Sequence, residues 1–294
     1  PKLASDIAHH LGFELSEIEV GHFSDGETAV HLGETVRGRD VFIVQSTCAP
    51  VNDNLMEMLI MIDALKRASA ASITAVMPYF GYARQDRKAK ARDPISAKLC
   101  ADLITAAGAD RVLTMDLHAP QIQGFFNIPV DHLLGVPILA PYFLEKFKDE
   151  LDDIVVVSPD FGSVTRARNF AQKLNAPIAI IDKRRPKPNV AEAMNIIGDV
   201  EGKTAIVIDD IVDTGGSLMG GVRMLAEKGA KEVYCACTHG VLSNNAIGRI
   251  NDSPVKEFVI TNSIPLGDKA NDNTANKVVV LSVGFMLAKV IEAI

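Results

Sequence analysis

Short runs of apolar, mostly β-branched residues alternate with helix-length segments along most of the chain. Eight runs have the length and composition of strands: 41–45, 72–77, 111–115, 154–158, 178–182, 204–209, 232–238 and 257–261. Apolar residues recur at helical spacing in other segments, at 55–70, 96–107 and 217–228. This alternation predicts an α/β fold in which mostly parallel sheets are flanked by helices.

The strands also indicate how deeply the sheets are buried. Residues 205–208 read Ala-Ile-Val-Ile, and a strand without polar positions fits a sheet that is covered on both faces. In such sheets, ligands bind at the carboxyl ends of the strands. The candidate functional residues are therefore those that follow the strands, at 79–92, 116–118, 158–160, 183–185 and 209–217.

The chain is long enough for two domains. Its 294 residues reach the size at which one hydrophobic core commonly divides. Proline and glycine interrupt the pattern near 129–135, so we predict two similar α/β domains, residues 1–131 and 132–294. Residues 277–294 are too interrupted by polar side chains to span a membrane and instead predict a strand and an amphipathic helix. That last helix is a candidate to pack back on the N-terminal domain.

Composition narrows the possible functions. The formal net charge of -7 opposes broad binding to nucleic acid, although basic residues concentrate at 84–92 and 183–185 and leave small anionic ligands possible. The cysteines lack metal-ligand spacing and are expected to be reduced core residues: Cys48, Cys100, Cys235 and Cys237. No secretory signal is visible, so we expect a cytoplasmic protein with no membrane partner.

The strongest local signal is a strand that leads into acids and a glycine turn. Residues 207–217 read Val-Ile-Asp-Asp-Ile-Val-Asp-Thr-Gly-Gly-Ser. The turn and the helix after it would present backbone N–H groups to a phosphate monoester. Asp209 and Asp210, just before the turn, suit sugar hydroxyls or Mg²⁺. A phosphorylated sugar fits the whole pattern, although a capped helix with solvated acids explains the same residues without a ligand.

Further cations and a histidine also follow predicted strands. The stretch 82–94 is either a solvated run of charges or a loop that closes over a polyphosphate and neutralises it. Lys183 and Arg185 fit a surface cluster as well as an anion site. An isolated histidine such as His118 is more often a structural residue than a metal ligand. Spacing alone leaves these alternatives open.

Taken with their surroundings, these motifs resemble the ribose-phosphate pyrophosphokinase family. The resemblance is carried, in the family's order, by segments 23–27, 82–94, 116–131, 157–168, 182–185 and 207–217. It implies the type I phosphoribosyltransferase fold and transfer of the β,γ-diphosphate of Mg-ATP to the 1-hydroxyl of ribose 5-phosphate. The products would be 5-phosphoribosyl 1-pyrophosphate and AMP.

The resemblance also implies roles for individual residues. Ribose 5-phosphate would bind at Asp209, Asp210, Asp213, Thr214, Gly215, Gly216 and Ser217. ATP would bind at Phe23, Asp25, Glu27, Arg84, Gln85, Asp86 and His118. The catalytic cations would be Lys183, Arg185 and Arg84, and the Mg²⁺ ligands would be His118 and Asp160.

Other implications concern assembly and local geometry. In the family, the residues that match Phe23, Asp25 and Glu27 line the adenine pocket of an adjacent subunit, so self-association, in a hexamer built of dimers, is expected to complete the nucleotide site. Ser163 stands where the family usually has a second glycine, and a positive φ there would strain a serine. Segments that bind regulatory phosphate or ADP in many relatives fall outside this sequence, so it leaves allosteric regulation open.

Two alternatives use the same sugar-phosphate loop. A phosphoribosyltransferase would consume phosphoribosyl pyrophosphate, but it gives no reason for segments 82–94 and 116–131. A non-catalytic regulatory subunit typically has an altered catalytic loop, whereas residues 84–88 here are continuous as Arg-Gln-Asp-Arg-Lys. The sequence therefore favours a working enzyme.

Overall fold

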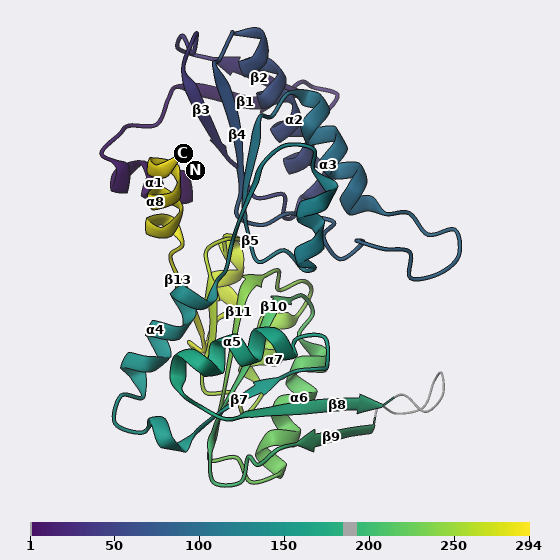
Figure 1. Cartoon of the computed structure of the whole chain (residues 1–294), viewed down its shortest axis with the longest axis vertical. Helices are drawn as coiled ribbons and strands as arrows, with labels where there is room; N and C mark the ends of the chain where they lie inside the picture. Colours follow the sequence, from purple (N-terminus) through teal and green to yellow (C-terminus); the bar gives the residue numbers. More distant parts are fainter. Residues whose placement is uncertain (1, 185–192) are drawn as a thin grey trace. The chain divides into compact units, whose positions relative to one another are not determined.

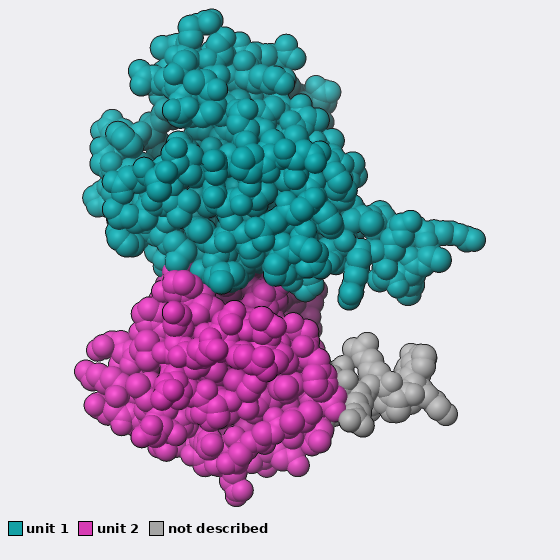
Figure 2. Space-filling view, viewed as in Figure 1, with its two compact units in different colours: residues 1–134, 282–294 teal, residues 135–281 magenta. Residues whose placement is uncertain are grey.

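The computed structural model describes residues 2–184 and 193–294. The chain divides into two compact units, distinguished by colour in Figure 2. Unit 1 comprises Pro1–Leu134 and Ser282–Ile294, and unit 2 comprises Gly135–Leu281. Each unit contains a sheet of mostly parallel strands with flanking helices, which confirms the predicted α/β fold (Figure 1).

Unit 1 is built on a parallel sheet with the strand order β3-β4-β5-β6. Its strands are β3 (Asp40–Val44), β4 (Ser72–Met77), β5 (Arg111–Met115) and β6 (Val130–Leu133). The segments between them form α2 (Val51–Arg67), α3 (Ser96–Ala107) and the short 3₁₀ helix η1 (Pro120–Phe125). Helix α2 buries Met58, Ile62 and Leu65, which share one face because they recur at helical spacing.

Two further pairs of elements complete unit 1. Strands β1 (Ile18–His22) and β2 (Thr28–Leu32) form an antiparallel hairpin. Helices α1 (Lys2–Leu11) and α8 (Gly284–Ala293) lie side by side near the two ends of the chain (Figure 1). The Ser282 hydroxyl donates a hydrogen bond to Asp6 beside this helix pair. The C-terminal helix therefore belongs to unit 1.

Unit 2 is built on a seven-stranded sheet with the order β13-β12-β11-β10-β7-β8-β9, parallel except at β8–β9. Its strands are β7 (Ile154–Ser158), β8 (Ile178–Arg184), β9 (Ala193–Ile197), β10 (Thr204–Val212), β11 (Glu232–Gly240), β12 (Phe258–Thr261) and β13 (Val278–Leu281). Its helices are α4 (Val136–Lys146), α5 (Val164–Leu174), α6 (Gly216–Glu227) and α7 (Ala246–Asn251), with the 3₁₀ helices η2 (Leu151–Asp153) and η3 (Gly267–Asp272).

The central strands of unit 2 are buried on both faces, as residues 205–208 predict. Along β10, Ala205 and Val207 pack in one apolar cluster with helix α6. The alternate residues Ile206 and Ile208 pack in a second cluster with helices α4 and α5. Because successive side chains of a strand point to opposite faces, this division places a helical layer on each side of the sheet.

Several elements differ from the predictions. Strand β10 continues through the acids to Val212, because Ile211 and Val212 still pair with β11. The hairpin β1–β2 and the short strands β6 and β9 are not predicted from their mixed polar and apolar residues. The predicted burial of the cysteines is confirmed, and all are free: Cys48, Cys100, Cys235 and Cys237. Within the described residues, no helix combines the length and apolar character that crossing a membrane requires.

Candidate active site

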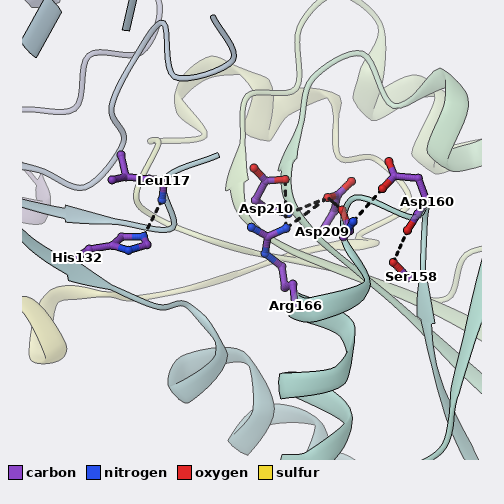
Figure 3. Close-up of polar contacts among 8 residues, drawn as sticks. Leu117, His132, Ser158, Asp160, Arg166, Asp209 and Asp210 are labelled. Carbon is purple, nitrogen blue, oxygen red and sulfur yellow. Dashed lines mark hydrogen bonds and ion pairs between the residues drawn. The ribbon is translucent and has the colours of Figure 1, made fainter. Parts of the chain in front are cut away.

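Two adjacent acids lie near the carboxyl end of β10. The Asp210 side chain is 7% exposed and the Asp209 side chain is 20% exposed. Asp209 Oδ1 accepts hydrogen bonds from the Asp210 backbone N–H at 2.9 Å and from the Ser163 hydroxyl at 3.1 Å. Arg166 Nη1 lies 3.5 Å from Asp210 Oδ1 and 4.0 Å from Asp209 Oδ1 (Figure 3). The acids are thus held by groups from the start of α5.

This environment changes the protonation of Asp209. Burial, followed by the negative charge of Asp210, raises the pKa of the Asp209 carboxyl to about 7 from its ordinary 3.8. Arg166 acts in the opposite direction, since its positive charge favours the carboxylate. An acid in this state is close to the balance between its neutral and ionised forms at neutral pH.

The predicted phosphate loop begins at Asp213, after the last two residues of β10. Gly215 has φ of 71°, a left-handed conformation that suits glycine, and helix α6 begins at the next residue. The amide groups of the first turn of α6 have no partners within the helix and can bind an anion. Neighbouring segments hold the loop: Ser243 N–H donates to Asp213 O at 3.0 Å, and Arg249 Nη1 donates to Thr214 O at 2.7 Å. Thr214, Gly216 and Ser217 are exposed.

Asp160 lies after the neighbouring strand β7. Its Oδ1 atom accepts the Ser163 backbone N–H at 2.9 Å, and its backbone carbonyl accepts the Ser158 hydroxyl at 2.7 Å (Figure 3). Ser163 precedes α5 with φ of -93°, so the serine is not strained at this position. The structure therefore brings Asp160, Ser163, Asp209 and Asp210 together at the ends of adjacent strands.

Lys183 lies on β8, which pairs with β7. Its backbone pairs with Met194 of the antiparallel strand β9, beyond the part of β8 that is in register with β7. The Lys183 side chain is outside the described part of the structure, and Arg185 lies outside the described residues. The structure therefore locates Lys183 by its strand alone.

In unit 1, the cationic stretch 82–94 joins β4 to α3 and projects from the body of the unit (Figure 1). Arg84, Gln85 and the residues from 87 to 92 are exposed. The ends of the stretch are tied down: the Tyr82 hydroxyl donates to Asn52, and the Ala97 N–H donates to Gln85 O at 3.2 Å. Its central residues belong to no helix or strand.

His118 follows β5, the strand beside β4. The His118 side chain is exposed, and the preceding Leu117 N–H donates to His132 Nε2 at 2.9 Å (Figure 3). Gln121 Nε2 donates to Asp86 Oδ2 at 3.3 Å, which links this segment to the cationic stretch. The sequence prediction gave no role to His132, whose place beside Leu117 depends on pairing of β5 with β6.

The third segment of unit 1 with a predicted nucleotide role is the tip of the β1–β2 hairpin. Phe23 N–H donates to Glu27 O at 2.8 Å, and Glu27 N–H donates to Asp25 Oδ1 at 3.2 Å. Gly26, with φ of 94°, makes this tight turn possible. Phe23, Asp25 and Glu27 are all exposed at the tip. The three predicted side chains are therefore accessible at the tip of the hairpin.

Within the described ranges, no group of three or more His, Cys, Asp and Glu side chains forms a ready metal site. Asp160 still supplies the hard oxygen donor that Mg²⁺ prefers. Magnesium commonly keeps several waters and binds substrate phosphates with one or two carboxylates, so a sparse set of protein ligands is compatible with it. The donor type fits Mg²⁺ at Asp160, whereas an imidazole such as that of His118 is a less usual magnesium ligand.

The fold and the placement of these residues define a class of protein: an α/β protein whose polar candidate residues lie at the carboxyl ends of parallel strands, where small ligands bind. The model for the N-terminal domain of ribose phosphate pyrophosphokinase matches residues 1–108, and that for the phosphoribosyl synthetase-associated domain matches residues 183–294. The chain belongs to the ribose-phosphate pyrophosphokinase family, and it is accordingly an enzyme.

Full-length relatives support this assignment. The ribose-phosphate pyrophosphokinase of Caldanaerobacter subterraneus subsp. tengcongensis is 68% identical over 292 residues, covering 99% of this chain and 90% of the relative. That of Bacillus subtilis is 58% identical over 291 residues, again covering 99% and 90%. The crystal structure of phosphoribosylpyrophosphate synthetase from Mycobacterium smegmatis is 46% identical with a TM-score of 0.93, covering 100% of this chain and 95% of that one.

Proposed function

We propose that this enzyme transfers the β,γ-diphosphate of Mg-ATP to the 1-hydroxyl of ribose 5-phosphate and releases AMP. The observation that carries the sugar assignment is the acid pair Asp209–Asp210, which lies near the end of β10 and shortly before the turn into α6. Two carboxylates can accept hydrogen bonds from the 2- and 3-hydroxyls, and the turn and first helical amides can bind the 5-phosphate. The ribose 5-phosphate residues would be Asp209, Asp210, Asp213, Thr214, Gly215, Gly216 and Ser217.

The nucleotide is assigned to unit 1. Arg84, Gln85 and Asp86 lie near the start of the cationic stretch, where most side chains are exposed and can approach a polyphosphate. His118 follows the adjacent strand and would approach the phosphates with Mg²⁺. Phe23, Asp25 and Glu27 would contact adenine bound to a neighbouring subunit, so a homo-oligomer, a hexamer built of dimers, is part of the proposal. We also propose a cytoplasmic location.

The chemistry would depend on positioning and charge neutralisation. The sugar 1-hydroxyl attacks the β-phosphorus in line and releases its proton to solvent. The bond from that phosphorus to the oxygen shared with the α-phosphate breaks, and AMP leaves with that oxygen. Lys183, Arg185 and Arg84 would balance the charge that develops on the transferred group. Mg²⁺, held by Asp160 and His118, would supply further neutralisation of the phosphate oxygens when bound.

The reaction is tested by measuring AMP release from Mg-ATP with and without ribose 5-phosphate, with mass analysis of the sugar. We expect AMP to depend on the sugar and the sugar to gain two phosphoryl groups. A folded, oligomeric sample that releases no AMP would instead favour the regulatory-subunit alternative.

The catalytic assignment is tested by Lys183→Ala. If the lysine contacts the diphosphate mainly in the transition state, turnover should fall by about 10² to 10³ while KM for ATP changes little. Lys203→Ala is the matched control, because Lys203 also belongs to unit 2 but forms an ion pair with Asp199. Unchanged turnover in the Lys183 variant would remove this residue from the catalytic set.

A further inference from the structure

Arg166 has no role in the proposed function, yet it faces the acid pair rather than solvent. It lies on the first turn of α5, and its side chain is 19% exposed. The same Nη1 atom lies 3.5 Å from Asp210 Oδ1 and 4.0 Å from Asp209 Oδ1 (Figure 3). By contrast, Arg168 on the same helix is exposed. Arg166 thus differs from Arg168 because it contacts the carboxylates of Asp209 and Asp210.

The acids need a nearby cation for a physical reason. Two adjacent carboxylates of low exposure repel each other, and burial further disfavours their charged forms. Sugar hydroxyls are best bound by ionised acceptors, and the incoming sugar also carries a phosphate dianion. A guanidinium keeps its charge at all relevant pH values and can contact two carboxylates at once. Arg166 meets this need from a neighbouring element.

Ser163 provides a second contact from the start of α5. Its hydroxyl donates to Asp209 Oδ1 at 3.1 Å, while its backbone N–H is held by Asp160 Oδ1 at 2.9 Å. A glycine at this position would keep the backbone contact and lose the one to Asp209. Serine in place of the family's usual glycine therefore links the turn before α5 to the acid pair.

We propose that Arg166, assisted by Ser163, is a positioning residue that balances the charge of Asp209 and Asp210 and fixes their carboxylates for the two ribose hydroxyls. The inference rests on the proposed sugar-binding role of these acids. Arg166 acts through the acids and does not contact the reacting atoms. Its removal should therefore weaken sugar binding selectively.

Steady-state kinetics of the full-length enzyme test this role. In Arg166→Gln, KM for ribose 5-phosphate should rise about tenfold or more, whereas KM for ATP should change less than about twofold. Arg166→Lys should recover part of the loss, because it restores the charge without the planar fork. Ser163→Gly should raise KM for the sugar by about threefold. Arg168→Gln is the matched control and should match the parent enzyme.

A double-mutant cycle separates action through the acids from an independent effect. Asp210→Asn alone should raise KM for ribose 5-phosphate, and adding Arg166→Gln should produce little further increase. If the two effects on KM simply multiply, Arg166 does not act through Asp210 and the inference fails.

The outcomes distinguish this inference from the proposed function. If Asp210→Asn leaves KM for the sugar unchanged, the sugar assignment itself fails and the role of Arg166 with it. If Asp210→Asn raises KM and Arg166→Gln does not, only the Arg166 inference is overturned. Thermal unfolding checks that each variant folds. If Arg166→Gln does not fold, the other two variants decide: KM values for the sugar equal to the parent's in both Arg166→Lys and Ser163→Gly would overturn the inference.

Discussion

The acid pair of unit 2 and the cationic stretch 82–94 of unit 1 are held in different ways. Asp209 and Asp210 belong to β10, where backbone pairing continues on to Val212. Their carboxylates contact Arg166 on α5 and Ser163 just before this helix. The cationic stretch lies between β4 and α3, and most of its side chains are exposed. One region is organised by the fold, and the other projects from it.

The two regions would therefore contribute to catalysis in different ways. A site organised by the fold binds its ligand without a large cost of ordering, and its residues also affect folding stability. An exposed loop adds little to stability and becomes ordered when a ligand supplies contacts. Substitutions in the acid pair should therefore change sugar binding and stability together. Substitutions in the loop should change turnover and leave stability nearly unchanged.

The largest expected effect is in the loop. Arg84→Ala should lower kcat/KM by about 10³, because an arginine that stabilises a transferring phosphoryl group contributes on that scale. The melting temperature should change little, since Arg84 is exposed. Coupled AMP-release kinetics and thermal unfolding of the same samples check both statements.

Arg67→Ala supplies the control for this prediction. Arg67 is an exposed arginine of unit 1 that pairs with Asp63 on the same helix at 2.7 Å, and such exposed pairs contribute little to stability. Its kinetics should match the parent enzyme. A large loss of stability in Arg84→Ala would show that the loop contributes to folding stability, as the acid pair is expected to do.

The sequence predicts the fold well where one physical signal dominates. The central strands of unit 2 are apolar throughout, so their burial on both faces follows directly from residues 205–208. The hairpin β1–β2 is missed because the alternation of Ile18 with Val20 and of Val30 with Leu32 is short, and neither strand is fully buried. Its formation depends on a five-residue turn and on packing of α2 against β2, which local patterns do not report.

The candidate site shows a similar division. Asp209, Asp210 and the glycine turn are adjacent in sequence, so a local pattern is enough to select them. Arg166 and Ser163 are more than 40 residues from these acids and meet them only because β7 and β10 are neighbours. His132 reaches Leu117 through the pairing of β5 and β6. Contacts of this kind require the strand order, which the sequence prediction did not specify.

A smaller effect concerns the pH dependence of stability. The pKa of Asp209 is raised to about 7, so the folded protein keeps this proton at pH values where the unfolded chain has lost it. Its stabilising contribution is complete below about pH 4 and is lost as pH rises through 7. Between pH 5 and 8, the unfolding free energy of Asp209→Asn should therefore gain roughly 3 kcal/mol relative to the parent enzyme.

Urea unfolding of the ligand-free proteins at several pH values measures this gain. Arg84→Ala is the control, and its difference from the parent should be independent of pH because the loop is exposed. A constant difference between Asp209→Asn and the parent would mean that Asp209 titrates as an ordinary acid. The acid pair would then behave like solvent-exposed acids, and the two regions would differ less in how strongly the fold affects their side chains.

The smallest expected effect is in the rate of proteolysis. The stretch 82–94 contains five tryptic sites: Arg84, Arg87, Lys88, Lys90 and Arg92. Since the central residues of the stretch are exposed and outside helices and strands, trypsin should cut there while leaving the chain after Arg166, within α5, intact. Mg-ATP should slow these cuts by about tenfold if the loop closes over the nucleotide, and ribose 5-phosphate alone should not. Fragment masses assign each cut. Equal protection by the two ligands would show that the loop also responds to the sugar, and the nucleotide role could then not be assigned to this loop alone.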